Sequence, residues 1–176
     1  WWDWSTAGKN DPVQKDKYGL PLYDKQKGDF RWEKDVKPTY MWFNGSVDRY
    51  LLGDKMDPSK VTHLNFPRGE RADKASKLVP FKVMQGKQPY DSVNNAFVVP
   101  NLWGGYWGHW DWNKAIADGQ KAAGQPYSGQ YGFAPTDMYW KVNHMVVPKA
   151  EALKCNECHG GGRIDWKALG YAGDPR

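Results

Sequence analysis

The sequence is poor in cysteine and histidine and has no long apolar run. Its 176 residues include two Cys and four His. Two Cys cannot form the disulfide framework of a small secreted scaffold. No stretch approaches the roughly 18 consecutive apolar residues of a membrane-spanning helix, so we expect no transmembrane segment. The chain begins at Trp1, with neither an initiator Met nor an apolar leader, which indicates a processed protein or a fragment.

The sequence also lacks a strong excess of charge of one sign. It carries 25 Lys and Arg against 20 Asp and Glu, and the two signs are interleaved. The densest basic stretch, from Arg68 to Lys77, contains Glu70 and Asp73. Nucleic-acid-binding domains concentrate Lys and Arg on one face. We therefore expect a mixed, solvated surface and no nucleic-acid partner.

Aromatic residues and helix breakers are abundant instead. The chain holds 11 Trp, 10 Tyr and 6 Phe, with 19 Gly and 12 Pro, at a mean hydropathy of −0.85. The aromatic content indicates a folded protein, because disordered chains are poor in aromatic residues. The Gly and Pro content excludes a coiled coil. We expect a mainly α fold with few short helices, extended loops and much irregular structure.

Local signals place the elements along the chain. Residues 1–40 are polar and are predicted to form an extended arm. Frequent prolines across residues 54–105 predict loops and brief strands. The clearest helix is predicted over residues 112–123, with Asp111 as its N-cap. A second helix is expected to begin near Pro148 and to run into Cys158.

One motif carries recognisable chemistry, because residues 155–159 read Cys-Asn-Glu-Cys-His. This is the C-x-x-C-H pattern that attaches c-type haem. Two thiols three positions apart at the end of a helix can both form thioethers with the porphyrin vinyl groups. The adjacent His159 can then bind the iron as proximal ligand. We expect one haem c bound by Cys155, Cys158 and His159, within a haem-binding C-terminal domain of residues 41–176.

Two other chemistries compete for the same residues. A zinc-binding interaction module could use Cys155, Cys158 and His159, although ribbon-type zinc sites usually take a second Cys pair, and this chain has no other Cys. A thioredoxin-like redox pair would need a βαβ setting, which the patterns do not indicate. Haem attachment is the favoured interpretation.

A c-type haem usually has a second axial ligand. His144 is the first candidate, because a His upstream of an attachment motif often serves a neighbouring haem in multihaem cytochromes. His109 and His63 are the next metal-ligand candidates. A thioether ligand is also considered, although packing is the commoner role of Met. The Met candidates are Met41, Met56, Met84, Met138 and Met145.

Aromatic residues gather around His109. They are Trp103, Tyr106, Trp107, Trp110 and Trp112. Such side chains either form a core or pack on porphyrin faces, whose large apolar area suits aromatic contacts. No basic groove accompanies them, so a base-stacking platform for nucleic acid is not favoured.

Several longer segments of the sequence resemble those of one protein family. They include ALKCNECH at 152–159, GRIDWKALGY at 162–171, and the segments 42–45, 49–55, 86–91, 126–131 and 138–146. On these segments the sequence resembles the C-terminal portion of the octahaem tetrathionate reductase family of multihaem c-type cytochromes. The resemblance spans nearly the whole chain.

The resemblance implies a periplasmic or extracellular cytochrome that stacks several haems and exchanges electrons with redox partner proteins. It implies electron transfer as the C-terminal part of such a protein, with another haem-bearing chain or segment, or a second copy, as partner. Neighbouring haems would then take ligands from the His residues of this chain. A role as part of a reductase for tetrathionate, nitrite or hydroxylamine is the alternative. The family's catalytic haem belongs to its N-terminal portion, so this chain alone is not expected to be catalytic.

Overall fold

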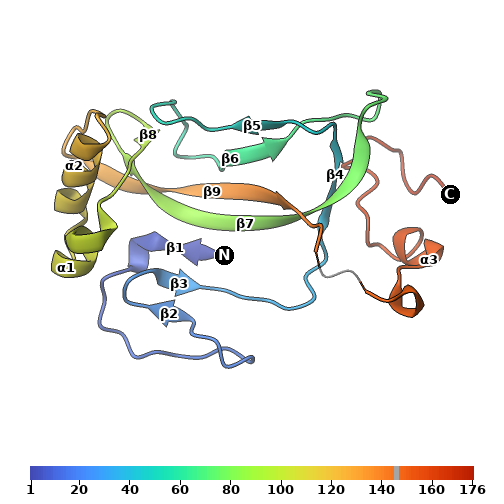
Figure 1. Ribbon diagram of the computed structural model, residues 1–176, viewed down its shortest axis with the longest axis horizontal. Coiled ribbons are helices and arrows are strands. Elements are labelled where there is room, and N and C mark those ends of the chain that lie inside the picture. The colour runs from blue at the N-terminus through green and yellow to red at the C-terminus, as the bar shows by residue number, and fades with distance from the viewer. Residues whose placement is uncertain (145–146) are drawn as a thin grey trace. The chain divides into compact units, whose positions relative to one another are not determined.

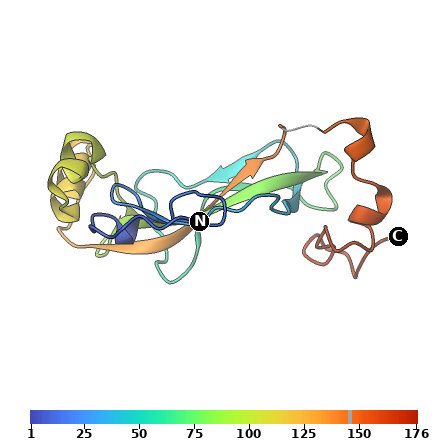
Figure 2. The same ribbon diagram turned by 90° about the horizontal axis from the view of Figure 1, so that it is seen from below.

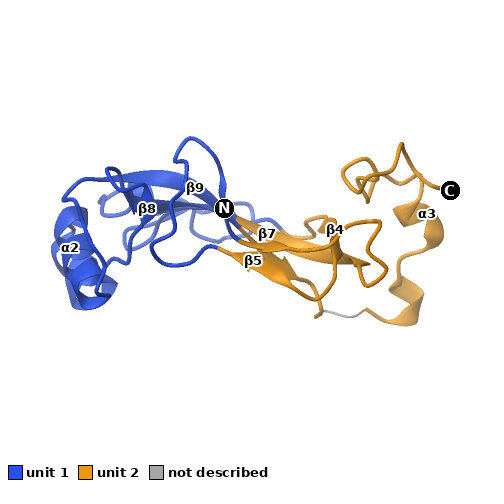
Figure 3. Ribbon diagram, turned by 90° about the horizontal axis from the view of Figure 1, so that it is seen from above, with its two compact units in different colours: residues 1–33, 50–64, 85–137 blue, residues 34–49, 65–84, 138–176 orange. Residues whose placement is uncertain are grey.

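The protein, described here by a computed structural model over residues 1–144 and 147–176, divides into two units. Unit 1 comprises residues 1–33, 50–64 and 85–137, and unit 2 comprises residues 34–49, 65–84 and 138–176 (Figure 3). Each unit therefore draws on three separate stretches of the chain. Within the described residues, no helix is both long and apolar enough to cross a lipid bilayer.

The expectation of a mainly α fold is wrong. Strands account for 29% of the structure and helices for 17%, and the strands form a nine-stranded mixed sheet. The longest strand, β7 (Lys77–Asp91), contains two of the prolines that predicted loops. Proline lacks a backbone N–H, but its carbonyl still accepts a hydrogen bond. Pro80 accepts from Val142 at 2.9 Å and Pro89 accepts from Val98 at 3.3 Å, so β7 continues through both.

Unit 1 contains several short strands and the second half of β7. The strands are β1 (Trp2–Asp3), β2 (Tyr23–Asp24), β3 (Gly28–Phe30) and β8 (Ala96–Phe97), and β9 (Tyr131–Lys141) begins in this unit. Of the short strands, β1 and β8 pair with the second half of β7, while β3 pairs with β1 and β2 pairs with β3. Strand β1 runs antiparallel to β3 and parallel to β7, where Trp2 is paired with Gly86. The first residues of the chain, predicted as an arm with little regular structure, thus contribute strands to the sheet (Figure 1).

A helical layer completes unit 1. It consists of η2 (Leu102–Tyr106), whose backbone is not helical from Trp103 to Gly105, followed by α1 (Trp107–His109) and α2 (Trp112–Ala122). The predicted N-cap of α2 is confirmed, because the Asp111 carboxylate accepts the Lys114 N–H at 3.1 Å. The buried face of α2 packs Ala115 and Ile116, both fully buried, into the aromatic core of this unit.

Unit 2 pairs the first half of β7 with β4 (Thr39–Phe43), and pairs β5 (Val47–Arg49) with the end of β6 (Thr62–Pro67). The helix expected from Pro148 into Cys158 is divided in two. A 3-10 helix η3 (Lys149–Glu151) comes first and α3 (Cys155–Cys158) follows, both at the red end of the chain in Figure 1 and Figure 2. The predicted attachment motif thus occupies one short, separate helical turn.

Candidate functional site

The two thiols of the predicted attachment motif lie on one helical turn. They stand at the first and last residues of α3, where Cys155 is exposed and Cys158 partly exposed, and both are free. The Glu157 carboxylate accepts the Lys154 backbone N–H at 2.7 Å and holds the start of this turn. Two unpaired thiols three positions apart are therefore accessible to one ligand.

The imidazole of His159 is oriented by a carboxylate and by an aromatic ring. Its Nδ1 donates to Asp174 Oδ1 at 2.6 Å, because an ionised carboxylate can only accept. The Trp166 ring stacks on the imidazole, with the centroids 5.0 Å apart and the planes at 17°. Since Nδ1 carries the proton, Nε2 presents a lone pair and is the nitrogen that can bind a metal.

Asp174 is itself held by several donors. Its carboxylate accepts the Gly160 N–H at 2.7 Å and the Arg176 N–H at 3.1 Å. The hydrogen bond from His159 is the largest cause that lowers the pKa of Asp174, and the two backbone N–H groups act in the same direction. Carboxylates placed in this way orient metal-ligating imidazoles and increase their basicity.

Other side chains of unit 2 hold the segment that carries Trp166. Trp42 of β4 donates from Nε1 to the Leu169 carbonyl at 3.0 Å. Arg71 donates from Nη1 to the Gly170 carbonyl at 2.9 Å, and its guanidinium lies 4.1 Å from the centroid of the Tyr171 ring. The Leu169 side chain is buried. The residues that follow the motif are therefore fixed to β4 and to the turn that carries Arg71, both in their own unit.

The donor set fits covalent haem better than zinc. A structural zinc site needs three or four ligands that converge on one point. Within residues 1–144 and 147–176, no three His, Cys, Asp or Glu side chains form such a group. Haem attachment needs two accessible thiols on one turn and an adjacent imidazole with an open Nε2. Cys155, Cys158 and His159 meet these requirements and would hold the group.

A second carboxylate–imidazole pair lies on neighbouring strands of unit 1. His63 of β6 contacts Asp137 Oδ1 of β9 through Nδ1 at 2.5 Å. The His63 side chain is 46% exposed, whereas that of Asp137 is 8% exposed. A buried carboxylate thus orients a half-exposed imidazole, as Asp174 orients His159.

The other two candidate His ligands are placed differently. His109, at the end of α1, accepts the Asp111 backbone N–H on Nδ1 at 3.1 Å. This places the proton on Nε2, which is buried and has no hydrogen-bond partner within the described residues. His144 is exposed. His63 and His109 belong to unit 1, and His144 and His159 belong to unit 2.

The Met candidates show no common placement. Met84 is 43% exposed. Met41, Met56 and Met138 are partly buried, and Met145 lies outside the described residues. Ligation by any of them stays a prediction.

The aromatic residues around His109 divide between core and surface. Tyr106 and Trp112 are buried and stack with their ring centroids 3.9 Å apart, and burial raises the pKa of Tyr106 to about 12. Trp103 is 83% exposed and meets Trp107 edge-on at 4.9 Å. The core interpretation therefore holds for the first pair, and Trp103 remains available to cover another surface.

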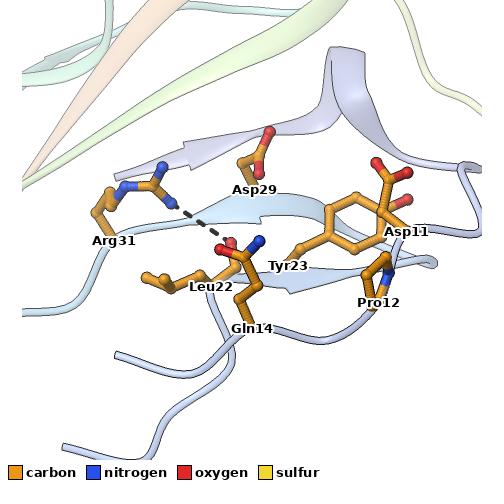
Figure 4. Close-up of a pocket in the computed structure, with 7 residues that line it drawn as sticks. All are labelled: Asp11, Pro12, Gln14, Leu22, Tyr23, Asp29 and Arg31. Atoms are coloured by element: carbon orange, nitrogen blue, oxygen red, sulfur yellow. Dashed lines mark hydrogen bonds between the residues drawn. The ribbon is translucent and has the colours of Figure 1, made fainter. Parts of the chain in front are cut away.

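A cavity of about 320 Å³ lies in the N-terminal part of unit 1 (Figure 4). Its lining is mainly polar and comprises Asp11, Pro12, Gln14, Leu22, Tyr23, Asp29 and Arg31. Arg31 spans one side and donates from Nη1 to the Leu22 carbonyl at 3.4 Å. None of these lining residues is Cys or His, so the cavity is separate from the predicted ligands.

Sequence reasoning missed both carboxylates that orient imidazoles. Asp174 lies 15 positions after His159, and Asp137 lies 74 positions after His63. Neither separation in sequence is one that the period of a single helix or strand would bring together. The available signal for Asp137 is an acidic residue inside an otherwise largely aromatic and apolar strand. Asp174 stands in a Gly-Asp-Pro turn sequence, which predicts a turn rather than a partner.

Comparisons with known proteins place these residues in context. A family model for bacterial cytochrome c matches residues 1–162, which include the attachment motif. The chain is similar to a crystal structure of octaheme cytochrome c from Shewanella oneidensis, at 51% identity and a TM-score of 0.94. This match covers 99% of the present chain and 42% of the Shewanella chain, so the present chain spans less than half of that protein. No curated protein matches the sequence.

Proposed function

Because the chain belongs to the bacterial cytochrome c family, we propose that it transfers electrons through one haem c attached to Cys155 and Cys158. His159 is the proximal ligand. The observation that carries the proposal is the pair of free thiols on one turn of α3, directly before an imidazole whose Nδ1 is held by Asp174. When bound, the haem supplies the iron couple that accepts and releases one electron.

The residues of the chain have separate roles in this proposal. The two thiolates hold the group covalently and prevent its loss. The hydrogen bond to Asp174 fixes the tautomer and direction of His159, so that Nε2 would be free to bind the iron. Trp166 covers one face of the imidazole and limits its rotation. A ligand fixed in advance needs little rearrangement when the iron changes charge.

The chain acts as the C-terminal part of a multihaem cytochrome in this proposal. It is supported by the coverage of 42% of an octahaem protein together with a single attachment motif. Its partners are another haem-bearing chain or segment, or a second copy, and redox proteins of the periplasm or the cell exterior. Reduction of tetrathionate, nitrite or hydroxylamine would be a property of that assembly and not of this chain alone.

The test is to produce the chain in a host that matures c-type cytochromes and to measure its mass and its pyridine haemochrome spectrum. We expect one haem per polypeptide. The double change Cys155→Ala with Cys158→Ala removes it, whereas Asn156→Ala, between the two thiols, keeps it. A polypeptide of unchanged mass would contradict the proposal. One zinc per chain without a Soret band would select the zinc module.

A further inference from the structure

Three hydrogen bonds gather on Asp174 next to the proximal imidazole. Its two carboxylate oxygens accept His159 Nδ1–H at 2.6 Å, Gly160 N–H at 2.7 Å and Arg176 N–H at 3.1 Å. The His159 and Asp174 side chains are each only 29% exposed. The carboxylate charge thus lies one hydrogen bond away from the imidazole, where it acts at short range.

We infer that Asp174 is a positioning residue that lowers the reduction potential of the haem bound by His159. This inference rests on the proposed function. The carboxylate draws the Nδ1 proton toward itself, which increases electron density on the imidazole. A more electron-donating imidazole stabilises the oxidised iron more than the reduced iron. The carboxylate charge also favours the more positive iron state.

The backbone donors give Asp174 a second, purely structural role that the test must separate from the first. Asn at this position keeps the size of the side chain and one carbonyl oxygen that can accept from Nδ1. It loses the negative charge and most of the pull on the proton. Asp174→Asn therefore removes the charge beside the ligand and keeps an acceptor for His159 Nδ1, although its NH₂ group no longer accepts the Gly160 N–H. Asp174→Glu keeps the charge.

A matched control lies in the same segment. Asp165 is exposed, and its carboxylate accepts the Ala168 N–H at 3.0 Å without contacting the imidazole. Asp165→Asn removes the same charge and keeps a side chain that can cap the turn. A general effect of net charge would appear equally in both variants.

The experiment is a spectroelectrochemical titration of the haem-loaded protein, with the EPR spectrum of the oxidised state as a second readout. In Asp174→Asn we expect the equilibrium between the two iron states to shift about tenfold toward the reduced form. That corresponds to about 59 mV for a one-electron couple. We expect the EPR signal of the same haem to change in Asp174→Asn. Asp165→Asn should match the wild type. Asp174→Glu, which keeps the charge, should have a reduction potential close to that of the wild type.

The outcomes separate this inference from the proposed function. If both proteins bind haem and Asp174→Asn has the same reduction potential as the wild type, the inference is overturned and the proposed function stands. Equal shifts in Asp174→Asn and Asp165→Asn also overturn it, since they report net charge alone. Absence of haem from the wild-type Cys155–Cys158 turn overturns both.

Discussion

Among single residues, Asp91 is the most heavily bonded carboxylate in unit 1. It is 1% exposed, and its oxygens accept the backbone N–H groups of Val93, Asn94 and Ser128 at 2.7 to 3.0 Å. The side chains of Asn94 and Ser128 add two further donors. Burial opposes ionisation, but these hydrogen bonds outweigh it and lower the pKa of Asp91 well below the ordinary value of 3.8.

We expect Asp91→Asn to reduce the free energy of unfolding by about 2 kcal/mol at pH 7, because the new NH₂ group faces donors and leaves them unpaired. A carboxylate with a lowered pKa in the folded state stabilises the protein above its unfolded pKa. This stability is lost as the pH falls below about 4. The difference between wild type and variant should therefore shrink at pH 3.

Urea denaturation at pH 7 and at pH 3 measures both effects. Asp118→Asn is the control, because Asp118 is exposed on α2 and its replacement should change stability by less than about 0.5 kcal/mol. A destabilisation that stays constant from pH 7 to pH 3 would show that the charge of Asp91 is not what stabilises the fold.

At the level of elements, α2 packs by its backbone as well as by its side chains. A Cβ atom at Gly119 would lie 1.9 Å from the Val99 carbonyl oxygen and 2.6 Å from the Asn101 nitrogen. The same loop is fixed to the helix by hydrogen bonds from Val99 N–H to Gln120 Oε1 and from Asn101 N–H to the Ala115 carbonyl, both at 2.8 Å. Gly119 is thus required for close approach.

We expect Gly119→Ala to destabilise the protein by about 2 kcal/mol, since the added methyl group forces the loop away from the helix. At an exposed helical position the same change would stabilise by up to about 1 kcal/mol through helix propensity. A loss of stability therefore indicates close packing at Gly119, and a gain indicates an exposed helical position. Thermal or urea unfolding followed by circular dichroism, with Asp118→Ala as the control on the same helix, makes the comparison.

Sequence patterns predict the local elements of this chain and miss its non-local pairings. Helix α2 can be predicted from the sequence because Asp111 marks its start. The attachment motif can be predicted because its residues, Cys155–Cys158, lie within one turn. Strand β7 is missed because Pro80 and Pro89 suggest loops, although their carbonyls take part in the hydrogen bonding. The partner of His159 is missed because no spacing rule specifies which polar residue a returning chain brings to Nδ1.

At the scale of the whole molecule, the chain presents an imidazole outside its own attachment motif that a carboxylate orients. His63 is half-exposed and held by Asp137, while the octahaem protein that the chain resembles is more than twice as long. We expect that His63 would bind the iron of a haem carried by another segment or chain. His144, first among the sequence candidates, stays a prediction as well.

His63→Ala in the haem-loaded assembly should convert one haem from six-coordinate low-spin to high-spin iron, because a strong-field nitrogen ligand is lost. EPR and near-infrared absorption of the oxidised protein report this change. Asp137→Asn should leave the iron low-spin with a shifted signal. His109→Asn, which keeps an acceptor for the Asp111 N–H, should match the wild type. Identical spectra for His63→Ala and wild type would exclude His63 as a ligand.

The separation in sequence between contacting residues also sets an order of events during folding. His159 and Asp174 are 15 positions apart, whereas the sheet joins Trp2 to Gly86. Contacts between nearby residues form faster, because closing a longer loop costs more chain entropy. The segment around α3 should therefore assemble first. Thioether bonds can then form while the strands are still unpaired, so that cofactor attachment precedes the pairing of the sheet.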